Sequence, residues 1–484
     1  MLIVLAVRHL LVHKGRSLLL LLGYGLGVAV MVVLLSVGAA MLEQSRDVAL
    51  VGGGEVTVLP LGIDVEAIRT GGASGMFFGI DRARFLTRQL LGGPRHAGVM
   101  RAVSPTIENK LVYLGAHGRV VPVRAGAELP SRARAVGAGL PVREGTWQDQ
   151  AEDSAWFAPT RQELYDELDH FHLPPVADST WAEWHYFNVT VGPNEWWYLT
   201  YLVAGQVMRG RWGGQLLVSH RKPDGGYDRW VEPVAADVIS LDTARADLAL
   251  GRSGVRQEDG VYRLRGQATG PAGALSFQLA LTPDANRYFP PADLREGALV
   301  SGYVVPALSG RVSGEICLRG RCKALHSVPG YHDHNWGVWR GVTWDWGAAR
   351  GKRLDLLYGA VYAPDDTLFS GTTAPRILVA VVDSLGVRQI LRARTIAYHG
   401  GTVPTAFSFV ASRDDDTLRV SAKVADYQVT QRGSAGRAQH FLQMRGTFEV
   451  EGTIAGEAVR DEGEGFFETY VGSAISRQPL AVSR

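Results

Sequence analysis

Cysteine is nearly absent from this chain of 484 residues, which contains only Cys317 and Cys322. Two cysteines exclude a disulfide-dense scaffold and a zinc site built on four thiolates. An excess of one charge is also missing, because 50 lysines and arginines are balanced by 48 aspartates and glutamates. No basic stretch is interleaved with aromatic residues, so no nucleic-acid partner is expected.

Several signatures of enzyme families are missing as well. The chain has no Walker sequence, no glycine-rich dinucleotide fingerprint and no Gly-x-Ser-x-Gly elbow. These absences argue against a bound nucleotide cofactor and against a serine hydrolase of the elbow type. The sequence therefore predicts a protein without a cofactor.

Glycine and tryptophan are abundant, with 58 and 12 residues, and 46% of the chain is hydrophobic. Abundant glycine with aromatic residues and few long helical patterns favours β-structure. Because domains usually hold roughly 100–200 residues, a chain of this length predicts about three of them.

One apolar run is long enough to cross a membrane. Residues 17–42 contain no charged side chain, and a hydrocarbon core needs about 20 helical residues. A cleavable signal peptide has a shorter apolar region of about 7–15 residues, so a retained anchor is expected, with cleavage near residues 38–40 as the alternative. Basic residues precede the run, which predicts that residues 1–16 are cytoplasmic. The prediction is a single-pass inner-membrane protein with periplasmic main domains.

The first quarter of the chain resembles a known family. The residues that carry the resemblance are 6–10, 14–18, 22–23, 26–29, 104–105 and 111–113. They are similar to the first transmembrane helix and the beginning of the extracytoplasmic domain of MacB/FtsX-type ABC-transporter permeases. The resemblance implies a permease-like segment over residues 43–130 and an association with ABC-transporter subunits. Such permeases have further spans that this chain lacks, so it is not expected to be a complete permease.

The segment between the anchor and the β-rich part predicts a small α+β piece and a linker. Residues 81–91 have a helical pattern, and 103–123 read as short strands. The linker covers residues 131–178, in which Thr160 and Glu163 have the spacing of a helix capping box.

From Trp181 to about residue 470, short strand-like runs recur between turn residues. This pattern is typical of β-sandwiches or β-barrels. Two successive β-units are expected to meet near residues 320–345, and the boundaries are placed at 179–330 and 331–475.

Residues 330–346 are dense in polar and aromatic side chains. Each polar group needs a partner if it is buried, so the stretch indicates either a functional pocket or a polar network joining two sheets. Its sequence is Gly330-Tyr331-His332-Asp333-His334-Asn335-Trp336-Gly337, followed by Trp339, Trp344, Asp345 and Trp346.

This stretch and a second motif, Trp181-x-Glu183-Trp184-x-Tyr186-Phe187-Asn188, together resemble the AttH-like family. That family includes the carotenoid 1,2-hydratases (hydroxyneurosporene synthases), and the resemblance covers about residues 155–475. It implies a mostly β fold of two tandem lipocalin-like (calycin-like) antiparallel β-barrels. It also implies, for the carotenoid members, addition of water across a terminal carbon–carbon double bond without a cofactor. Those hydratases pair a His-x-Trp, here His334 and Trp336, with a later Tyr-x-Asp that is absent here.

Hydration of an alkene needs an acid that protonates carbon and aromatic faces that stabilise the resulting cation. Asp333 or Glu183 would donate the proton, because burial raises the pKa of a carboxyl group, and His334 would position or relay it. The residues expected to bind the ligand are Trp184, Tyr186, Tyr331, His332, Trp336, Trp344 and Trp346.

Two other interpretations of the histidines remain open. Asp333 between His332 and His334 could belong to a structural network that closes a barrel interface. His326, His332 and His334 could bind a metal, but strand alternation places His332 and His334 on one face and Asp333 on the other. No metal is expected.

Cys317 and Cys322 are separated by four residues that include a glycine. This spacing suits a hairpin in which the two sulfur atoms face each other. A disulfide is therefore predicted if the compartment is oxidising. Two ordinary thiols on a strand pair are the alternative.

The leading functional hypothesis is a membrane-anchored module that binds an apolar lipid-like molecule and works with an ABC transporter. The mouth of a barrel and the space between two barrels are natural apolar sites. The second hypothesis is a hydratase, isomerase or cyclase acting on a carotenoid- or terpenoid-like lipid by protonating a C=C bond. The third is a structural partner of a transporter complex.

Overall fold

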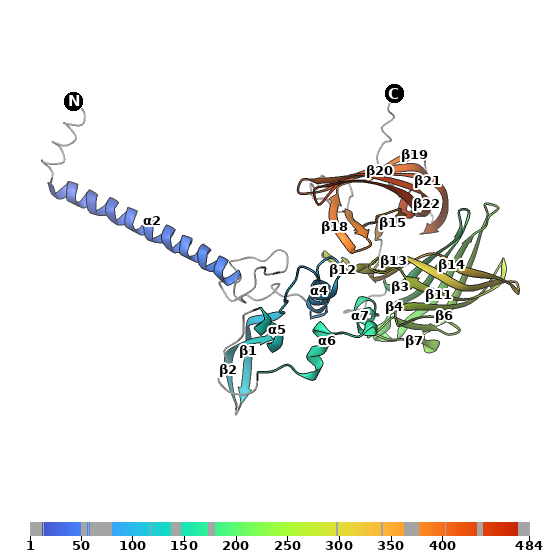
Figure 1. Cartoon of the computed structure of the whole chain (residues 1–484), viewed down its shortest axis with the longest axis horizontal. Helices are drawn as coiled ribbons and strands as arrows, with labels where there is room; N and C mark the ends of the chain where they lie inside the picture. The colour runs from blue at the N-terminus through green and yellow to red at the C-terminus, as the bar shows by residue number, and fades with distance from the viewer. Residues whose placement is uncertain are drawn as a thin grey trace, which may run out of the picture. The chain divides into compact units, whose positions relative to one another are not determined.

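The structure is a computed structural model, and its residues separate into two units, 1–91 with 99–157 and 92–98 with 158–484. Each unit is described by itself (Figure 1). The predicted segments 1–16, 43–130 and 131–178 are described only in part. The described residues are 12, 14–49, 56, 58, 80–116, 118–136, 147–172, 180–296, 299–339, 342–362, 377–401, 403–432 and 439–472.

Helix α2 (Lys14–Ala49) contains the apolar run and extends it at both ends. Its segment Lys14–Val37 has a mean hydropathy of 2.7, and none of that segment is buried. A helix of this length and composition can span a hydrocarbon core. The prediction of one N-terminal helix apolar enough to cross a membrane is therefore confirmed.

The rest of the first unit contains a β-hairpin and short helices, as the patterns of residues 81–91 and 103–123 predict. Strands β1 (Thr106–Ala116) and β2 (Arg119–Glu128) pair antiparallel. The Arg88 side chain in helix α4 donates from Nε to the Ala155 carbonyl at 2.9 Å, which links two of the helices. The helices are α4 (Ile80–Gly92), α5 (Pro130–Ala135), α6 (Ser154–Phe157) and the 3-10 turn η1 (Ala151–Asp153).

Helix α7 (Arg161–Leu168) opens the second unit, and it begins at the predicted capping box. Thr160 Oγ1 accepts a hydrogen bond from the Glu163 amide at 3.2 Å, and Glu163 Oε2 accepts one from the Thr160 amide at 2.6 Å. These two bonds satisfy free N–H groups in the first turn. The helix brings the following residue, Asp169, into the first β-unit.

The first β-sheet curls into a nearly closed barrel of eleven strands, here called barrel A. The strand order is β6-β5-β4-β3-β14-β13-β11-β10-β9-β8-β7, and β12 pairs with β13. In Figure 1 it is coloured green to yellow. Its elements are β3 (Trp181–Gly192), β4 (Glu195–Gln206), η2 (Val207–Arg209), β5 (Arg211–Arg221), β6 (Tyr227–Ala235), η3 (Ala236–Val238), β7 (Ile239–Leu241), β8 (Asp247–Leu250), β9 (Ser253–Glu258), β10 (Val261–Gly270), β11 (Gly273–Pro283), β12 (Phe289–Glu296), β13 (Leu299–Leu318) and β14 (Arg321–Val338).

Strand β10 shows why the sequence curls into a barrel. Tyr262, Leu264 and Ala268 are buried in the barrel core, whereas the residues between them, such as Arg263 and Arg265, are exposed. Alternation with period two leaves one apolar face, which must be covered. Closing the sheet on itself covers that face.

Trp230 fills the seam where barrel A nearly closes. Its side chain on β6 is fully buried, and Nε1 donates to the Gly273 carbonyl at 2.8 Å. A Cβ atom at Gly270 would lie 2.8 Å from Trp230 Cδ1. The indole therefore takes the space beside β10 that a side chain at residue 270 would need.

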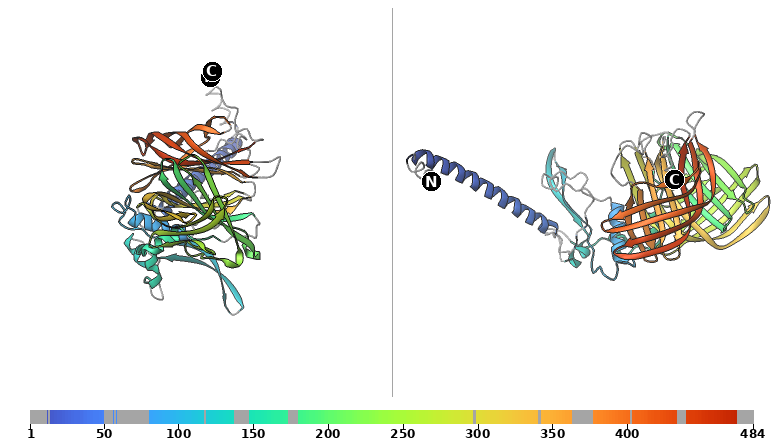
Figure 2. Two further views of the ribbon diagram at one scale, coloured as in Figure 1. Left: turned by 90° about the vertical axis from the view of Figure 1, so that its right-hand side faces the viewer. Right: turned by 90° about the horizontal axis from the view of Figure 1, so that it is seen from above.

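The second β-sheet has nine strands, of which eight close into a barrel and the ninth, β19, pairs only with β20; it is here called barrel B. Its order is β18-β17-β16-β15-β23-β22-β21-β20-β19, and an additional pairing of β18 with β20 closes it. Barrel B is coloured orange to red in Figures 1 and 2. Its strands are β15 (Thr343–Gly351), β16 (Asp355–Tyr362), β17 (Ile377–Asp383), β18 (Gly386–Ala393), β19 (Ala397–Gly400), β20 (Pro404–Arg413), β21 (Asp416–Arg432), β22 (Gln439–Ile454) and β23 (Glu457–Gly472).

The expected mostly β fold with two barrels after an apolar helix is thus confirmed, and the two barrels pack against each other (Figure 2). Strand β16 is buried on both faces, because one face lines barrel B and the other meets barrel A. The first sheet runs to Val338 and the second begins at Thr343, inside the stretch 320–345 where the two units are expected to meet but beyond the boundary set at residue 330. The motif strand β14 belongs to barrel A because it pairs with β3 along residues 330–338.

Cys317 and Cys322 lie opposite each other at the hairpin between β13 and β14, and they form a disulfide. The predicted pairing is therefore confirmed.

Candidate functional site

Strands β3 and β14 carry the two motifs and pair antiparallel. His334 lies opposite His185, and Asp333 lies opposite Tyr186. Because side chains alternate along a strand, each motif is divided between two faces. His332, His334 and Trp336 point into barrel A with Glu183, His185 and Phe187, whereas Tyr331, Asp333 and Asn335 face barrel B with Trp184 and Tyr186.

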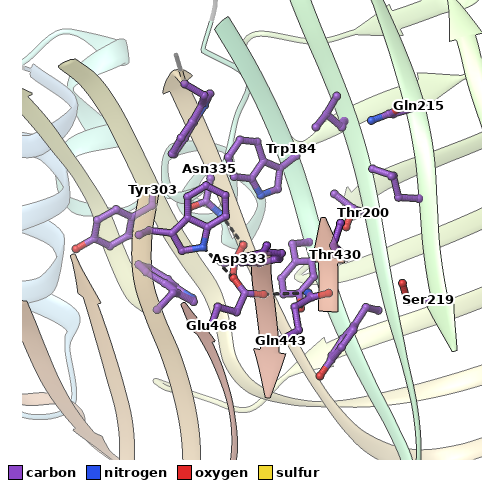
Figure 3. A pocket seen from close by; sticks show the side chains of 18 of the residues that line it. Trp184, Thr200, Gln215, Ser219, Tyr303, Asp333, Asn335, Thr430, Gln443 and Glu468 are labelled. Atoms are coloured by element: carbon purple, nitrogen blue, oxygen red, sulfur yellow. Dashed lines mark hydrogen bonds between the residues drawn. The ribbon is translucent and has the colours of Figure 1, made fainter. Parts of the chain in front are cut away.

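A cavity lies between the two barrels on the Asp333 face (Figure 3). Its volume is about 180 Å³, well above the roughly 10–15 Å³ that one water needs, so it admits an organic group. On its rim, Arg229 of barrel A donates from Nη1 to Thr430 Oγ1 of barrel B at 3.2 Å. Eleven of its twenty lining residues are aromatic or aliphatic, and the other nine are polar or charged. A concave site that combines apolar walls with converging polar groups suits a small molecule.

Asp333 is the buried acid of this cavity, and 2% of its surface is exposed. The Tyr331 hydroxyl donates to Oδ2 at 2.7 Å, and Asn335 Nδ2 donates to Oδ1 at 2.6 Å. Burial, together with the nearby Glu468, raises the pKa of Asp333 well above its usual value, although both hydrogen bonds act the other way. Asp333 takes part in none of the ion pairs among the described residues. Its position therefore favours a neutral acid that can donate a proton.

Barrel B supplies a second carboxyl group, Glu468 on β23. Trp344 Nε1 donates to Oε2 at 3.1 Å, and Gln443 Nε2 donates to Oε1 at 3.1 Å. Gln443 Nε2 also donates a hydrogen bond to the Tyr186 hydroxyl at 3.0 Å. Burial and then Glu468 raise the pKa of Tyr186 well above its usual value. Asp333, Glu468 and Gln443 lie close together in the wall of the cavity (Figure 3).

Tryptophan side chains form the apolar wall. The rings of Trp184 and Trp339 lie 4.7 Å apart between centroids, and those of Trp184 and Trp344 lie 6.3 Å apart. Trp346 Nε1 donates to the Tyr331 hydroxyl at 3.1 Å, so this indole fixes the group that holds Asp333. The faces of such rings attract positive charge.

The opposite face of β14 meets a second polar cluster inside barrel A. His334 Nδ1 lies 2.5 Å from Asp169 Oδ1, and its Nε2 lies 2.9 Å from Glu183 Oε1. Burial acts to lower the pKa of His334, but the two carboxylates outweigh burial and raise that pKa to about 9. For Asp169 burial acts in the opposite direction and raises the pKa of the carboxyl group. The charges of His334 and His185 outweigh burial and hold that pKa well below its usual value.

The structure divides the residues predicted for one site between these two clusters. Asp333, Trp184, Tyr186, Trp344 and Trp346 line the cavity, and Tyr331 holds Asp333. The others lie in barrel A, because strand alternation turns neighbouring residues to opposite faces. Trp336, expected in the apolar slot, instead stacks on His172 at 3.6 Å between ring centroids. The residues inside barrel A are Glu183, His332, His334 and Trp336.

Sequence reasoning missed Glu468, Gln443 and Asp169. Glu468 has a weak signal, because it interrupts the apolar run Phe466-Phe467-Glu468-Thr469-Tyr470. Asp169 belongs to an acidic stretch of the predicted linker and gives no signal of its own. Only the fold brings these residues to the motif strands.

Comparison with known proteins gives no match to a family model and no match among curated sequences. The chain is similar in structure to kievitone hydratase from Nectria haematococca, with 15% identity over 60% of this chain and 89% of that chain and a TM-score of 0.41. It is also similar to CghA with Sch210972, with 10% identity over 60% and 88% and a TM-score of 0.42. An AttH protein from Nitrosomonas europaea shares 18% identity over 60% and 91%, with a TM-score of 0.38. At these identities and TM-scores, the similarities do not indicate an activity for this chain.

Proposed function

We propose that the cavity between the barrels binds an apolar unsaturated molecule and that Asp333 protonates it. One observation carries this proposal: a carboxyl group without an ion-pair partner lies buried in the wall of a cavity lined by tryptophans. Such a group is kept neutral by burial and can act as a general acid. The AttH-like motifs Trp181–Asn188 and Gly330–Gly337 agree with a hydratase, isomerase or cyclase.

In the proposed reaction the O–H bond of Asp333 breaks and a C–H bond forms at one alkene carbon. The neighbouring carbon becomes a cation, which the faces of Trp184 and Trp344 stabilise while they exclude bulk water. A water then adds to the cation, and its released proton goes to Glu468 and from there back to Asp333. If a proton leaves the adjacent carbon instead, the product is an isomer and no water is consumed.

The test of this chemistry uses lycopene, a linear polyene with terminal isoprenoid double bonds, presented in detergent micelles to the full chain in D₂O. We expect deuterium bound to carbon in the recovered polyene, with or without the added mass of one water. Recovery of unlabelled lycopene that nevertheless binds to the protein would favour a carrier.

A binding and transfer function is the second candidate, and helix α2 favours it, because an apolar anchor would bring the chain to a membrane that contains such molecules. We place the anchor in the inner membrane with a cytoplasmic N-terminus and periplasmic barrels, and ABC-transporter subunits are the proposed partner. Under this proposal Asp333 and Glu468 orient one polar end of the ligand.

Trp344 is expected to contribute strongly to binding in either function. Replacing Trp344 with alanine removes a ring from the cavity wall and a donor to Glu468, so the Kd for all-trans-retinol as a polyene probe should rise about 10–100-fold. Retinol fluorescence measures the change. Trp147→Ala, in the first unit, is the matched control and should leave Kd unchanged, whereas equal effects of the two substitutions would contradict the placement of the ligand.

The proposed topology predicts that protease added outside spheroplasts digests both barrels while a tag on the N-terminus survives. The basic residues before the apolar run are the reason for this orientation. Full protection of the barrels in intact spheroplasts, followed by digestion after lysis, would contradict it.

A further inference from the structure

The cluster inside barrel A contains a histidine without any hydrogen bond. His185 is fully buried, and neither Nδ1 nor Nε2 has a hydrogen-bond partner, although Asp169 Oδ2 lies 3.9 Å from Nδ1. Leaving such a group unpaired in a dry interior costs free energy. One ligand atom each from Asp169, His185 and His334 lies within 4.8 Å of the others. Two imidazoles and a carboxylate therefore converge on one buried point.

The neighbouring groups are arranged as an outer shell around that point. His334 Nε2 lies 2.9 Å from Glu183 Oε1, a charge contact without the geometry of a hydrogen bond, and Nδ1 faces Asp169. His332 uses Nδ1 toward the Tyr186 carbonyl at 3.1 Å, which leaves Nε2 facing Asp169 at 3.3 Å. A histidine that binds a metal through one nitrogen commonly donates its other N–H to a carboxylate or carbonyl.

The Asp169 carboxylate is also oriented by an outer group. The Tyr262 hydroxyl donates to Oδ2 at 2.7 Å. Asp169, Tyr262 and His332 are all buried, so water does not compete for these positions.

We propose that Asp169, His185 and His334 bind a divalent transition-metal ion inside barrel A, with His332 as the nearest further nitrogen ligand. Imidazole and carboxylate donors suit Zn²⁺ and its neighbours in the first transition row. Metal–ligand bonds of about 2.1 Å set tetrahedral donors roughly 3.4 Å apart. The 2.5 Å contact between His334 and Asp169 must therefore widen by a small side-chain movement.

The proposed metal is structural, because its ligands lie on the face of β14 opposite Asp333 and line no part of the cavity. It would join strands β3 and β14 to the segment that follows α7. The inference is independent of the proposed function. The sequence predicts no metal, because strand alternation separates Asp333 from His332 and His334. The carboxylate of the proposed site is instead Asp169, from the predicted linker.

The competing account is a metal-free network in which His334 is an imidazolium between Asp169 and Glu183. His185 distinguishes the two accounts, because it takes no part in the hydrogen bonds of that network. His220→Gln is the matched control, since His220 is also buried, has no hydrogen bond at either ring nitrogen and lies outside the cluster.

The experiment uses the full chain, purified in detergent with a tag that contains no histidine. Metal content is measured by mass spectrometry, and the protein is then stripped with EDTA and titrated with Co²⁺ while its visible absorption is recorded. We expect about one ion per chain and a Co²⁺ affinity at least about 10-fold weaker in His185→Gln, with no change in His220→Gln. X-ray absorption of the cobalt form should show nitrogen and oxygen neighbours with imidazole scattering, and this readout does not depend on a variant that folds. Failure of the wild-type chain to bind Co²⁺ or Zn²⁺ stoichiometrically, or equal affinity in His185→Gln, would overturn the proposal.

Discussion

Replacing Asp333 with asparagine is expected to lower turnover by about 10²–10⁴-fold, the usual contribution of a positioned general acid. Asparagine keeps the size of the side chain and can still contact Tyr331 and Asn335, but it has no carboxylic proton to give to carbon. Binding should persist, because aromatic and aliphatic side chains, and not Asp333, form the apolar wall. The measurement compares deuterium transfer from D₂O to lycopene with the Kd for retinol in the same preparations.

The matched control is Asp237→Asn, an exposed carboxylate of barrel A outside the cavity. This substitution should change neither the deuterium transfer to lycopene nor the Kd for retinol. Unchanged deuterium transfer in Asp333→Asn would reject Asp333 as the acid. A parallel loss of transfer and of retinol binding would instead show that Asp333 orients the ligand, as the transfer hypothesis requires.

Trp230→Ala is expected to give the largest loss of stability in barrel A. Removing a fully buried indole costs about 3–5 kcal/mol, and the hydrogen bond from Nε1 to the Gly273 carbonyl is lost as well. The seam beside β10 would then be left open, because Gly270 has no side chain to fill it. For a domain of this size the melting midpoint should fall by roughly 6–20 °C.

Circular dichroism near 215 nm during heating measures this midpoint. Val238→Ala, at an exposed position of the same barrel, should stay within about 0.5 kcal/mol of the wild type. Equal midpoints for Trp230→Ala and the wild type would show that the seam does not hold barrel A closed.

Much of the fold could be predicted from local pattern. Strict alternation in β10 marks a strand with one buried face, and the spacing of Thr160 and Glu163 marks the first turn of α7. These signals are local, because each depends on residues within one element. The boundary between the barrels could not be placed in this way, because β14 joins barrel A only through its pairing with β3.

The candidate site could be predicted only in part for the same reason. Asp333 and Trp344 belong to the motif stretch and do line the cavity. Glu183 and His334 belong to the same two motifs and could also transfer a proton, but strand alternation turns their side chains to the interior of barrel A. Glu468 comes from the last strand of barrel B, more than a hundred residues further along the chain, so only the packing of the two barrels brings it to Asp333.

The most direct test of the central claim is mass spectrometry of the apolar molecules that co-purify with the full chain, before and after incubation in D₂O. The proposed function predicts one unsaturated molecule bound per chain, which gains carbon-bound deuterium in the wild type and is retained without label in Asp333→Asn. A chain that carries no such molecule, or one whose ligand gains the same label in both proteins, would contradict it.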